Sequence, residues 1–260
     1  MNEQTKPEFQ DILNLISELP DYPEFTSTQT DMTLWLQSWL LAYSRILNLS
    51  KGFSVNRCAL YWTGYDAQDG FDGQAFVDSC RDTKGSLNQL ASILDTDLQI
   101  FELSPNNTTK PTLDELTMAA SYGMMGVEEN TQLFCACSFG QGVESASQDA
   151  LDCLKNNFDD LESFIVENCG LDHAAMLGAA IACILKGIPM ILEGTSGQLV
   201  KVLLEKTAGK AFPNVITTDD LKFPDENSLP AHDMVLTAVI MKSLMAYNVK
   251  TDCGKIKVAA

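Results

Sequence analysis

The strongest constraint on the fold is an alternation of strand patterns and helical patterns between residues 57 and 218. Short apolar runs such as RCALYW and LFCACSF are typical of strands that are buried on both faces of a sheet. A longer segment with helical periodicity follows each run. Strand–helix–strand alternation predicts right-handed βαβ units and a parallel sheet. We therefore expect an α/β fold, a doubly wound and mostly parallel sheet with helices on both faces and a small helical lobe.

The alternation divides the sequence into three parts. Residues 1–54 predict an N-terminal helical segment, residues 55–220 a nucleotide-binding-like α/β core, and residues 221–260 a C-terminal loop and helix that complete the small lobe. Within the core, Thr112 is a predicted N-cap, because its hydroxyl can accept a hydrogen bond from a free N–H of the first turn. Gly209 is a predicted helix end, because glycine adopts the left-handed conformation at no steric cost.

Charge narrows the class of partner. The 260 residues carry a net charge of −18, which argues against nucleic acid and against an anionic membrane surface. No unbroken apolar run is long enough to span a membrane, and the polar beginning of the sequence favours a cytoplasmic protein. A phosphorylated ligand remains compatible with the charge, because backbone N–H groups at a helix N-terminus can hold a phosphate.

Glycine-rich or polar segments follow three of the expected strands. They are Gly64–Asp66, Gly140–Gly142 and Glu193–Gly197. Ligands of open parallel sheets bind beyond the carboxyl ends of the strands, so these segments are candidate binding loops, although each alone is compatible with an ordinary turn. None of them matches the P-loop, GxGxxG or GxSxG patterns. Backbone amides there predict a phosphate cradle formed by Gly140, Gly142, Gly194, Thr195 and Ser196.

The titratable side chains favour carboxylates for acid–base chemistry. The sequence has two histidines, and both His173 and His232 lie where a helix is expected to begin, which favours capping or packing. Glu193 ends a buried strand, where desolvation raises a carboxylate pKa towards the range of a general base. Glu226 is the second candidate. The alternatives are that Glu193 holds its loop through hydrogen bonds and that Glu226 is an exposed loop acid.

Eight cysteines give no metal pattern. Cys135 and Cys137 form a C-x-C pair whose side chains a strand directs to one face. Neither histidine lies at a zinc-binding spacing, so we predict free buried thiols, no metal and no cofactor.

One segment resembles a known family. GLDHAAMLGAAIACILKGIPMILEGTSG, residues 170–197, is similar to the glycine, aromatic, acid, small-residue helix and PVLLDGF series of the nicotinate-nucleotide:dimethylbenzimidazole phosphoribosyltransferases. The elements that flank it agree in order over residues 55–218. The family transfers the phosphoribosyl group of nicotinate mononucleotide to a benzimidazole base in cobalamin biosynthesis. The resemblance implies a doubly wound α/β domain, a homodimer, no metal, and as partners a nucleotide and an aromatic base.

The resemblance breaks down at the family's catalytic motifs, so the sequence resembles a shortened, divergent member of that family. Aligned with the family's GExGxxNTT loop, Gly123 and Gly126 are kept as substrate-binding candidates, but Met124 takes the place of the acid. The family's KPxGSLG motif is absent. Its GEGSGA motif, with the proposed base, has no clean match, and Glu226 is the nearest acid.

Two explanations follow for a core that is kept with rewritten loops. One is a divergent transferase that binds a nicotinate mononucleotide-like ligand. The other is a catalytically inactive homologue, a pseudoenzyme, that acts as a binding or regulatory partner. Methionine cannot transfer a proton, so Met124 favours the second, whereas the glycine loops favour a ligand site. An unrelated nucleotide-sugar or acyl enzyme on the same sheet is a third reading, against which the missing phosphate motifs argue.

Overall fold

The computed structural model describes most of the expected core. The described residues are 8–27, 32–43, 56–63, 77–78, 81–82, 86–93, 96–103, 110–140, 142–156 and 158–221. Several expectations concern positions outside these ranges: the closing helix at 231–249, His232, Gly64–Asp66 and Glu226.

The described strands form one five-stranded parallel sheet in the order β2-β1-β3-β4-β5. Their bounds are β1 (Asn56–Trp62), β2 (Thr96–Glu102), β3 (Leu133–Phe139), β4 (Met190–Leu192) and β5 (Val215–Thr217). The chain moves from β1 outward to β2, then returns past β1 and continues in the other direction. This order is that of a doubly wound sheet, and the predicted fold class is confirmed.

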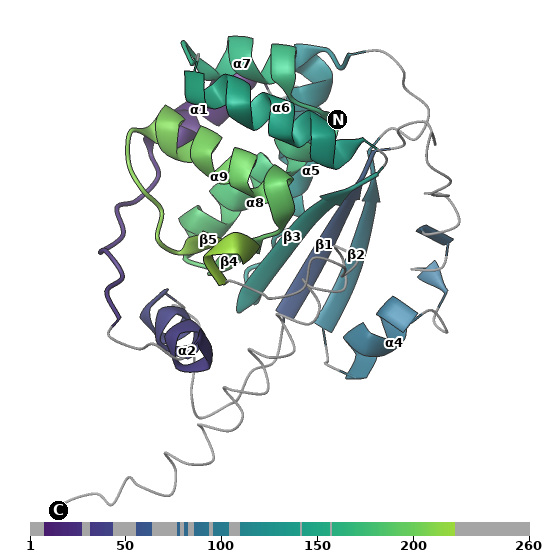
Figure 1. Ribbon diagram of the computed structural model, residues 1–260, viewed down its shortest axis with the longest axis vertical. Helices are drawn as coiled ribbons and strands as arrows, with labels where there is room; N and C mark the ends of the chain where they lie inside the picture. Colours follow the sequence, from purple (N-terminus) through teal and green to yellow (C-terminus); the bar gives the residue numbers. More distant parts are fainter. Residues whose placement is uncertain are drawn as a thin grey trace, which may run out of the picture.

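Helices cover both faces of the sheet (Figure 1). On one side lie α2 (Met32–Tyr43) and α4 (Ser86–Ile93). On the other side lie α1 (Phe9–Ser17), α5 (Leu113–Met125), α6 (Val143–Asn156), α7 (Leu161–Asn168), α8 (Leu171–Lys186) and α9 (Gly194–Ala208). A short 3-10 helix, η1 (Thr218–Leu221), follows β5.

Alternate residues of each strand supply two separate cores. Cys58, Leu60, Cys135, Cys137 and Ile191 face α2 and form the α2-side core. The residues between them face the larger helical layer and form the α8-side core, which includes Ala59, Tyr61, Phe134, Ala136 and Leu192. The expected shared face of Cys135 and Cys137 is therefore confirmed. Period-two alternation produces this division because successive side chains point to opposite faces of a strand.

The α8-side core also includes the beginning of the described chain. Phe9, Ile12 and Ile16 of α1 are buried in it, and α8 is buried along almost its whole length between the sheet and the neighbouring helices. The small residues of α8 allow this close packing. Gly178 lies against α5, where an added Cβ would meet the Ala120 carbonyl oxygen at 1.9 Å.

Local signals placed several helix ends correctly. The Thr112 hydroxyl accepts the Glu115 N–H at 3.3 Å, and Gly209 ends α9 in the left-handed conformation with φ of 67°. The helices α6 and α7 are separate, because Asp160 begins α7 by accepting the Ser163 N–H at 2.8 Å.

Candidate functional site

The strand order creates a switch point between β1 and β3 at the carboxyl edge of the sheet. The chain leaves β1 towards β2 by way of α4 on one side, whereas it leaves β3 towards β4 by way of helices on the other side. Connections that diverge in this way leave a crevice beyond the strand ends, which is where open α/β sheets bind ligands.

The segment after β3 lies tightly against the end of β1. Gly140 has a φ of 149°, and a Cβ there would lie 2.4 Å from the carbonyl oxygen of Thr63. Gly142 has a φ of 75°, is exposed, and has open space where a Cβ would be. Because a side chain at Gly140 would collide with β1, the close approach of the two strand ends depends on this glycine. Gln141 lies outside the described residues.

The segment after β4 is the first turn of α9 and not the loop that the sequence suggested. Glu193 is the N-cap and Gly194 the first helical residue, with a φ of 64°. A Cβ at Gly197 would lie 2.7 Å from the carbonyl carbon of Leu192, so this glycine lets α9 pack closely on β4. The Gly194 N–H donates to Thr218 Oγ1 at 3.1 Å, which ties the helix start to the end of β5.

The first turns of α6 and α9 touch each other. Thr195 Oγ1 donates a hydrogen bond to Glu144 Oε1, and the Ser147 and Ser196 hydroxyls are 2.7 Å apart. The structure therefore brings together five of the predicted ligand-binding residues, Gly140, Gly142, Gly194, Thr195 and Ser196. Two helix N-termini, each with N–H groups that no carbonyl of the same helix accepts and a partial positive charge, meet there.

A buried polar row lies beneath these two turns. Asp172 Oδ2 accepts a hydrogen bond from the Ser138 hydroxyl, and His173 Nε2 lies 2.9 Å from Ser147 Oγ. With Asp172 Oδ1 3.7 Å from His173 Nδ1, the series Ser147–His173–Asp172 has the composition of a hydrolase triad.

Hydrogen bonding excludes a nucleophilic role for that triad. His173 Nδ1 accepts the N–H of Gly170 at 3.0 Å, so in the neutral ring the proton is on Nε2, which donates to Ser147. A general base needs the opposite tautomer. The Ser147 hydroxyl itself donates to the Val143 carbonyl at 2.6 Å, and all three side chains are buried. The expected capping and packing role of His173 is confirmed.

Glu193 is buried, with 6% of its surface exposed, as the end of a buried strand predicts. Its N–H donates to the Ala136 carbonyl at 3.0 Å, and its carbonyl accepts the Gly197 N–H at 3.0 Å. A hydrogen bond with Cys58, burial, and the nearby charge of Glu193 raise the pKa of the Cys135 thiol. The Glu193 carboxylate is thus near enough to the Cys135 thiol to affect its ionisation.

Gly123 and Gly126 lie far from the strand-end site. The Gly126 carbonyl accepts a hydrogen bond at 3.0 Å from Arg57, at the beginning of β1, so this end of α5 lies near the start of the strands. A Cβ at Gly123 would lie 1.8 Å from the Ala175 carbonyl oxygen of α8. Met124 packs against the α8-side core in the last turn of α5. Gly123 therefore has a packing role. Because Met124 lies away from the strand-end site, its replacement of the family's acid is no argument for or against catalysis at that site.

Sequence reasoning missed three residues of the site: Glu144, Ser138 and Asp172. Glu144 looked like an ordinary acid in the first turn of an amphipathic helix, and Ser138 like one polar residue in an apolar strand. Asp172 was noted only as the acid in the segment that resembles the family, and no role was predicted for it. A fully buried carboxylate is a strong signal of a functional or structural network, but burial becomes visible only in the folded chain.

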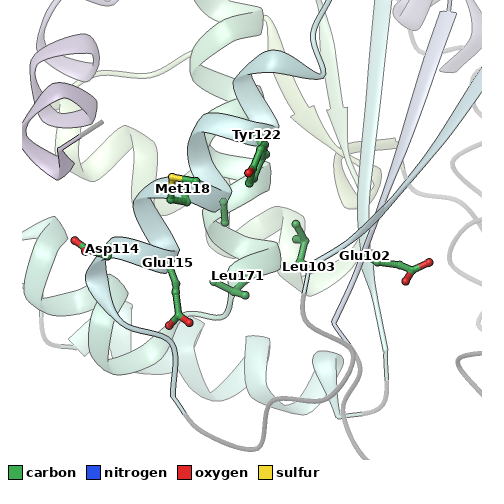
Figure 2. Close-up of a pocket in the computed structure, with 8 residues that line it drawn as sticks. Glu102, Leu103, Asp114, Glu115, Met118, Tyr122 and Leu171 are labelled. Atoms are coloured by element: carbon green, nitrogen blue, oxygen red, sulfur yellow. The ribbon is translucent and has the colours of Figure 1, made fainter. Parts of the chain in front are cut away.

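A pocket of about 400 Å³ lies beside this site, at the end of β2 (Figure 2). Carboxylates and apolar side chains from β2, α5 and α8 line it: Glu102, Leu103, Asp114, Glu115, Met118, Ala119, Tyr122 and Leu171. Glu102 forms an ion pair with Arg81, and Glu115 caps α5. The acidic rim disfavours an anionic group, so a phosphate is better accommodated at the starts of α6 and α9.

Metal-binding clusters and membrane-spanning helices are both absent from the described residues. These residues contain no group of three or more histidine, cysteine, aspartate or glutamate side chains placed to hold a metal ion. In the same part of the chain, no helix combines the length and apolar character needed to cross a membrane.

The geometry defines a doubly wound α/β protein with its candidate site at the carboxyl edge of the sheet. Among solved structures, the fold is similar to that of nicotinate-nucleotide-dimethylbenzimidazole phosphoribosyltransferase from Thermus thermophilus, with a TM-score of 0.62 and 15% identity over 92% of this chain and 93% of that chain. A structure of CobT from the same organism gives a TM-score of 0.61 and 13% identity over 91% and 94%. No family model and no curated protein matches the sequence.

At this level of identity the likeness is one of fold. The resemblance noted in the sequence is thus confirmed as a phosphoribosyltransferase-like fold that extends over most of the chain.

Proposed function

We propose that this chain is a divergent phosphoribosyltransferase-like protein that binds a nicotinate mononucleotide-like ligand at the first turns of α6 and α9. The observation that carries the proposal is the meeting of these two helix N-termini beyond the ends of β3 and β4, next to Gly140 and Gly142. Helix N-terminal N–H groups and helix dipoles favour a phosphate at such a place without any lysine or arginine. The similar fold of the two Thermus structures supports the choice of ligand.

In a transferase reaction, the incoming nitrogen forms a bond to the ribose C1′ as the bond from C1′ to nicotinate breaks. A carboxylate then accepts the proton of the attacking nitrogen. We propose Glu193 and Glu226 for this role, as the sequence suggested. Glu193 is buried at the end of β4 and is the N-cap of α9, which places it at the start of one of the two helices that form the proposed site. The cytoplasmic location and the homodimer remain predictions from the sequence.

A second candidate is a catalytically inactive homologue that binds a partner protein. The observation in its favour is a pair of exposed apolar side chains about one turn apart on α5, Tyr122 at 49% and Met125 at 75% exposed. Exposed apolar side chains that gather on one helix face are typical of interaction surfaces. This reading predicts a stable complex with another protein and no turnover of a nucleotide.

The test is binding of nicotinate mononucleotide, nicotinate and 5,6-dimethylbenzimidazole to the purified protein, measured by calorimetry and thermal shift. A ligand at 100 times its dissociation constant stabilises the native state by about 2.7 kcal/mol, which gives a clear rise in Tm. We expect the mononucleotide to bind. Failure of all three compounds to bind would reject the proposal and leave the partner protein as the better reading.

Gly142→Ala localises the binding. Among the described residues, no atom other than those of its chain neighbours lies within 4 Å of the added Cβ. We therefore expect the variant to keep the fold, at a cost of about 1 kcal/mol for alanine in a left-handed conformation. Gly209→Ala is the matched control, because Gly209 has a similar φ of 67° and equally open surroundings at the far end of α9. We expect Gly142→Ala to weaken binding of the mononucleotide and Gly209→Ala to leave it unchanged.

A further inference from the structure

A carboxylate of the chain itself occupies the junction of α6 and α9. Glu144 Oε1 accepts a hydrogen bond from the hydroxyl of Thr195. The other oxygen, Oε2, lies 3.8 Å from the position of a Cβ on Gly194, and it is the one atom within 4 Å of that position among the described residues. The first turn of α9 thus has an anionic group at the place where a ligand phosphate is expected.

The surroundings explain why the carboxylate is stable there. The N–H groups of Thr195 and Ser196 are in the first helical turn, where no carbonyl of the same helix can accept them. Glu144 also belongs to the first turn of its own helix, α6. A negative charge is favoured at both helix N-termini, and Glu144 supplies one to each at the same time.

We propose that Glu144 is a specificity-determining residue that competes with the phosphate of a ligand for the start of α9. The inference rests on the proposed function for the identity of the site. Glu144 is exposed, so a rotation of its side chain vacates the position without movement of the backbone. A phosphate that binds there must either displace the Glu144 carboxylate or lie close to its negative charge. Either effect reduces the difference in affinity between a phosphorylated ligand and the same ligand without phosphate.

The experiment compares nicotinate mononucleotide with its dephosphorylated riboside, and both with inorganic phosphate, on the full chain by calorimetry. Glu144→Gln keeps the size of the side chain and an oxygen that can accept the Thr195 hydroxyl, but removes the charge. We expect the preference for mononucleotide over riboside to rise about tenfold, because the like charge at close range is gone. Asp149→Asn is the control, since it removes the same charge from an exposed position of α6 beyond its first turn.

The outcomes separate the two proposals. A gain in Glu144→Gln with none in Asp149→Asn supports the competition. No gain, or an equal gain in both variants, overturns it, while binding of the mononucleotide by the wild type would still uphold the proposed function. If no nucleotide binds any of the three proteins, the proposed function fails, and inorganic phosphate decides about Glu144: tighter binding to Glu144→Gln upholds the competition, and equal or absent binding overturns it.

Discussion

Two glycines at the crossing of α5 and α8 are needed for the distance between the helices. A Cβ at Gly123 would lie 1.8 Å from the Ala175 carbonyl oxygen, and a Cβ at Gly178 1.9 Å from that of Ala120. The contacts are reciprocal and involve backbone atoms, which cannot turn aside as a flexible side chain can. A methyl group on either helix would therefore force the helices apart.

Gly123→Ala tests this packing through the sign of the stability change. Helix propensity alone favours alanine over glycine by about 1 kcal/mol in a helix interior. Overpacking usually costs about 1–3 kcal/mol, and the backbone clash places this substitution at the upper end. We expect net destabilisation, measured as a lower urea midpoint with an unchanged m-value. An alanine variant as stable as the wild type would contradict the observed helix contact.

At the same scale, the sequence identified candidate glycines but not their roles. Gly123 and Gly140 both looked like binding-loop glycines, because a sequence shows the missing side chain and not the atom it would meet. Gly140 and Gly142 were expected in a loop directly after an apolar strand, and both lie there with positive φ, whereas their predicted role at a phosphate stays a prediction. The contact between Glu144 and Thr195 joins residues 51 positions apart, and no local pattern could have revealed it.

At the scale of elements, helix ends were predictable where a single side chain decides them. Thr112 and Gly209 act within their own turns, so sequence reasoning placed both correctly. The start of α9 was missed because Gly-Thr-Ser-Gly has low helix propensity and looks like a loop. Tertiary contacts outweigh that propensity: Gly197 packs on β4, and the Gly194 N–H bonds to Thr218 at 3.1 Å.

Thr112→Ala measures what one such cap contributes. The Thr112 N–H and hydroxyl both donate to the Glu115 carboxylate, at 2.8 and 2.9 Å, and the hydroxyl accepts the Glu115 N–H. Loss of the hydroxyl should cost about 1 kcal/mol of stability at neutral pH, measured by urea unfolding. Thr207→Ala is the control, because its hydroxyl bonds to a carbonyl within α9 and to no acid.

The pH dependence of that difference has a definite sign. Hydrogen bonds from Thr112, the backbone N–H first and the hydroxyl second, lower the pKa of Glu115 below its ordinary value of 4.5. A lowered pKa means that the carboxylate stabilises the folded state above its unfolded pKa and loses this effect as the pH falls through the folded pKa. The difference in free energy of unfolding between wild type and Thr112→Ala should therefore become smaller below pH 4.5. The difference between wild type and Thr207→Ala should not change with pH. If the loss of stability caused by Thr112→Ala stays constant or grows as the pH falls, the Thr112–Glu115 hydrogen bonds do not stabilise the helix as proposed.

For the whole molecule, the alternation of strand and helix patterns was enough to predict a doubly wound parallel sheet. The order of its strands was not predictable in the same way, because it depends on which strands pair, and similar apolar runs such as those of β1 and β3 carry no local mark of their neighbours. The sheet that results is shared by two cores, one on each face. Since every strand contributes side chains to both, we expect the two cores to unfold together.

The cysteines of the chain make that coupling measurable. Cys58, Cys135 and Cys137 are buried in the α2-side core, Cys169 and Cys183 in the α8-side core, and Cys153 is partly exposed. Burial also raises the pKa of Cys169 and Cys183, which suppresses the reactive thiolate. With iodoacetamide under native conditions, peptide mass spectrometry should find that, of the six cysteines in the described residues, Cys153 is labelled first and the other five are protected. As urea is raised, the cysteines of both cores should become reactive over one common transition, because the sheet that both share unfolds as a unit. Labelling of Cys58 and Cys135 at a lower urea concentration than Cys183 would show instead that the α2 side opens independently, and the two faces would then have to be treated as separate cooperative units.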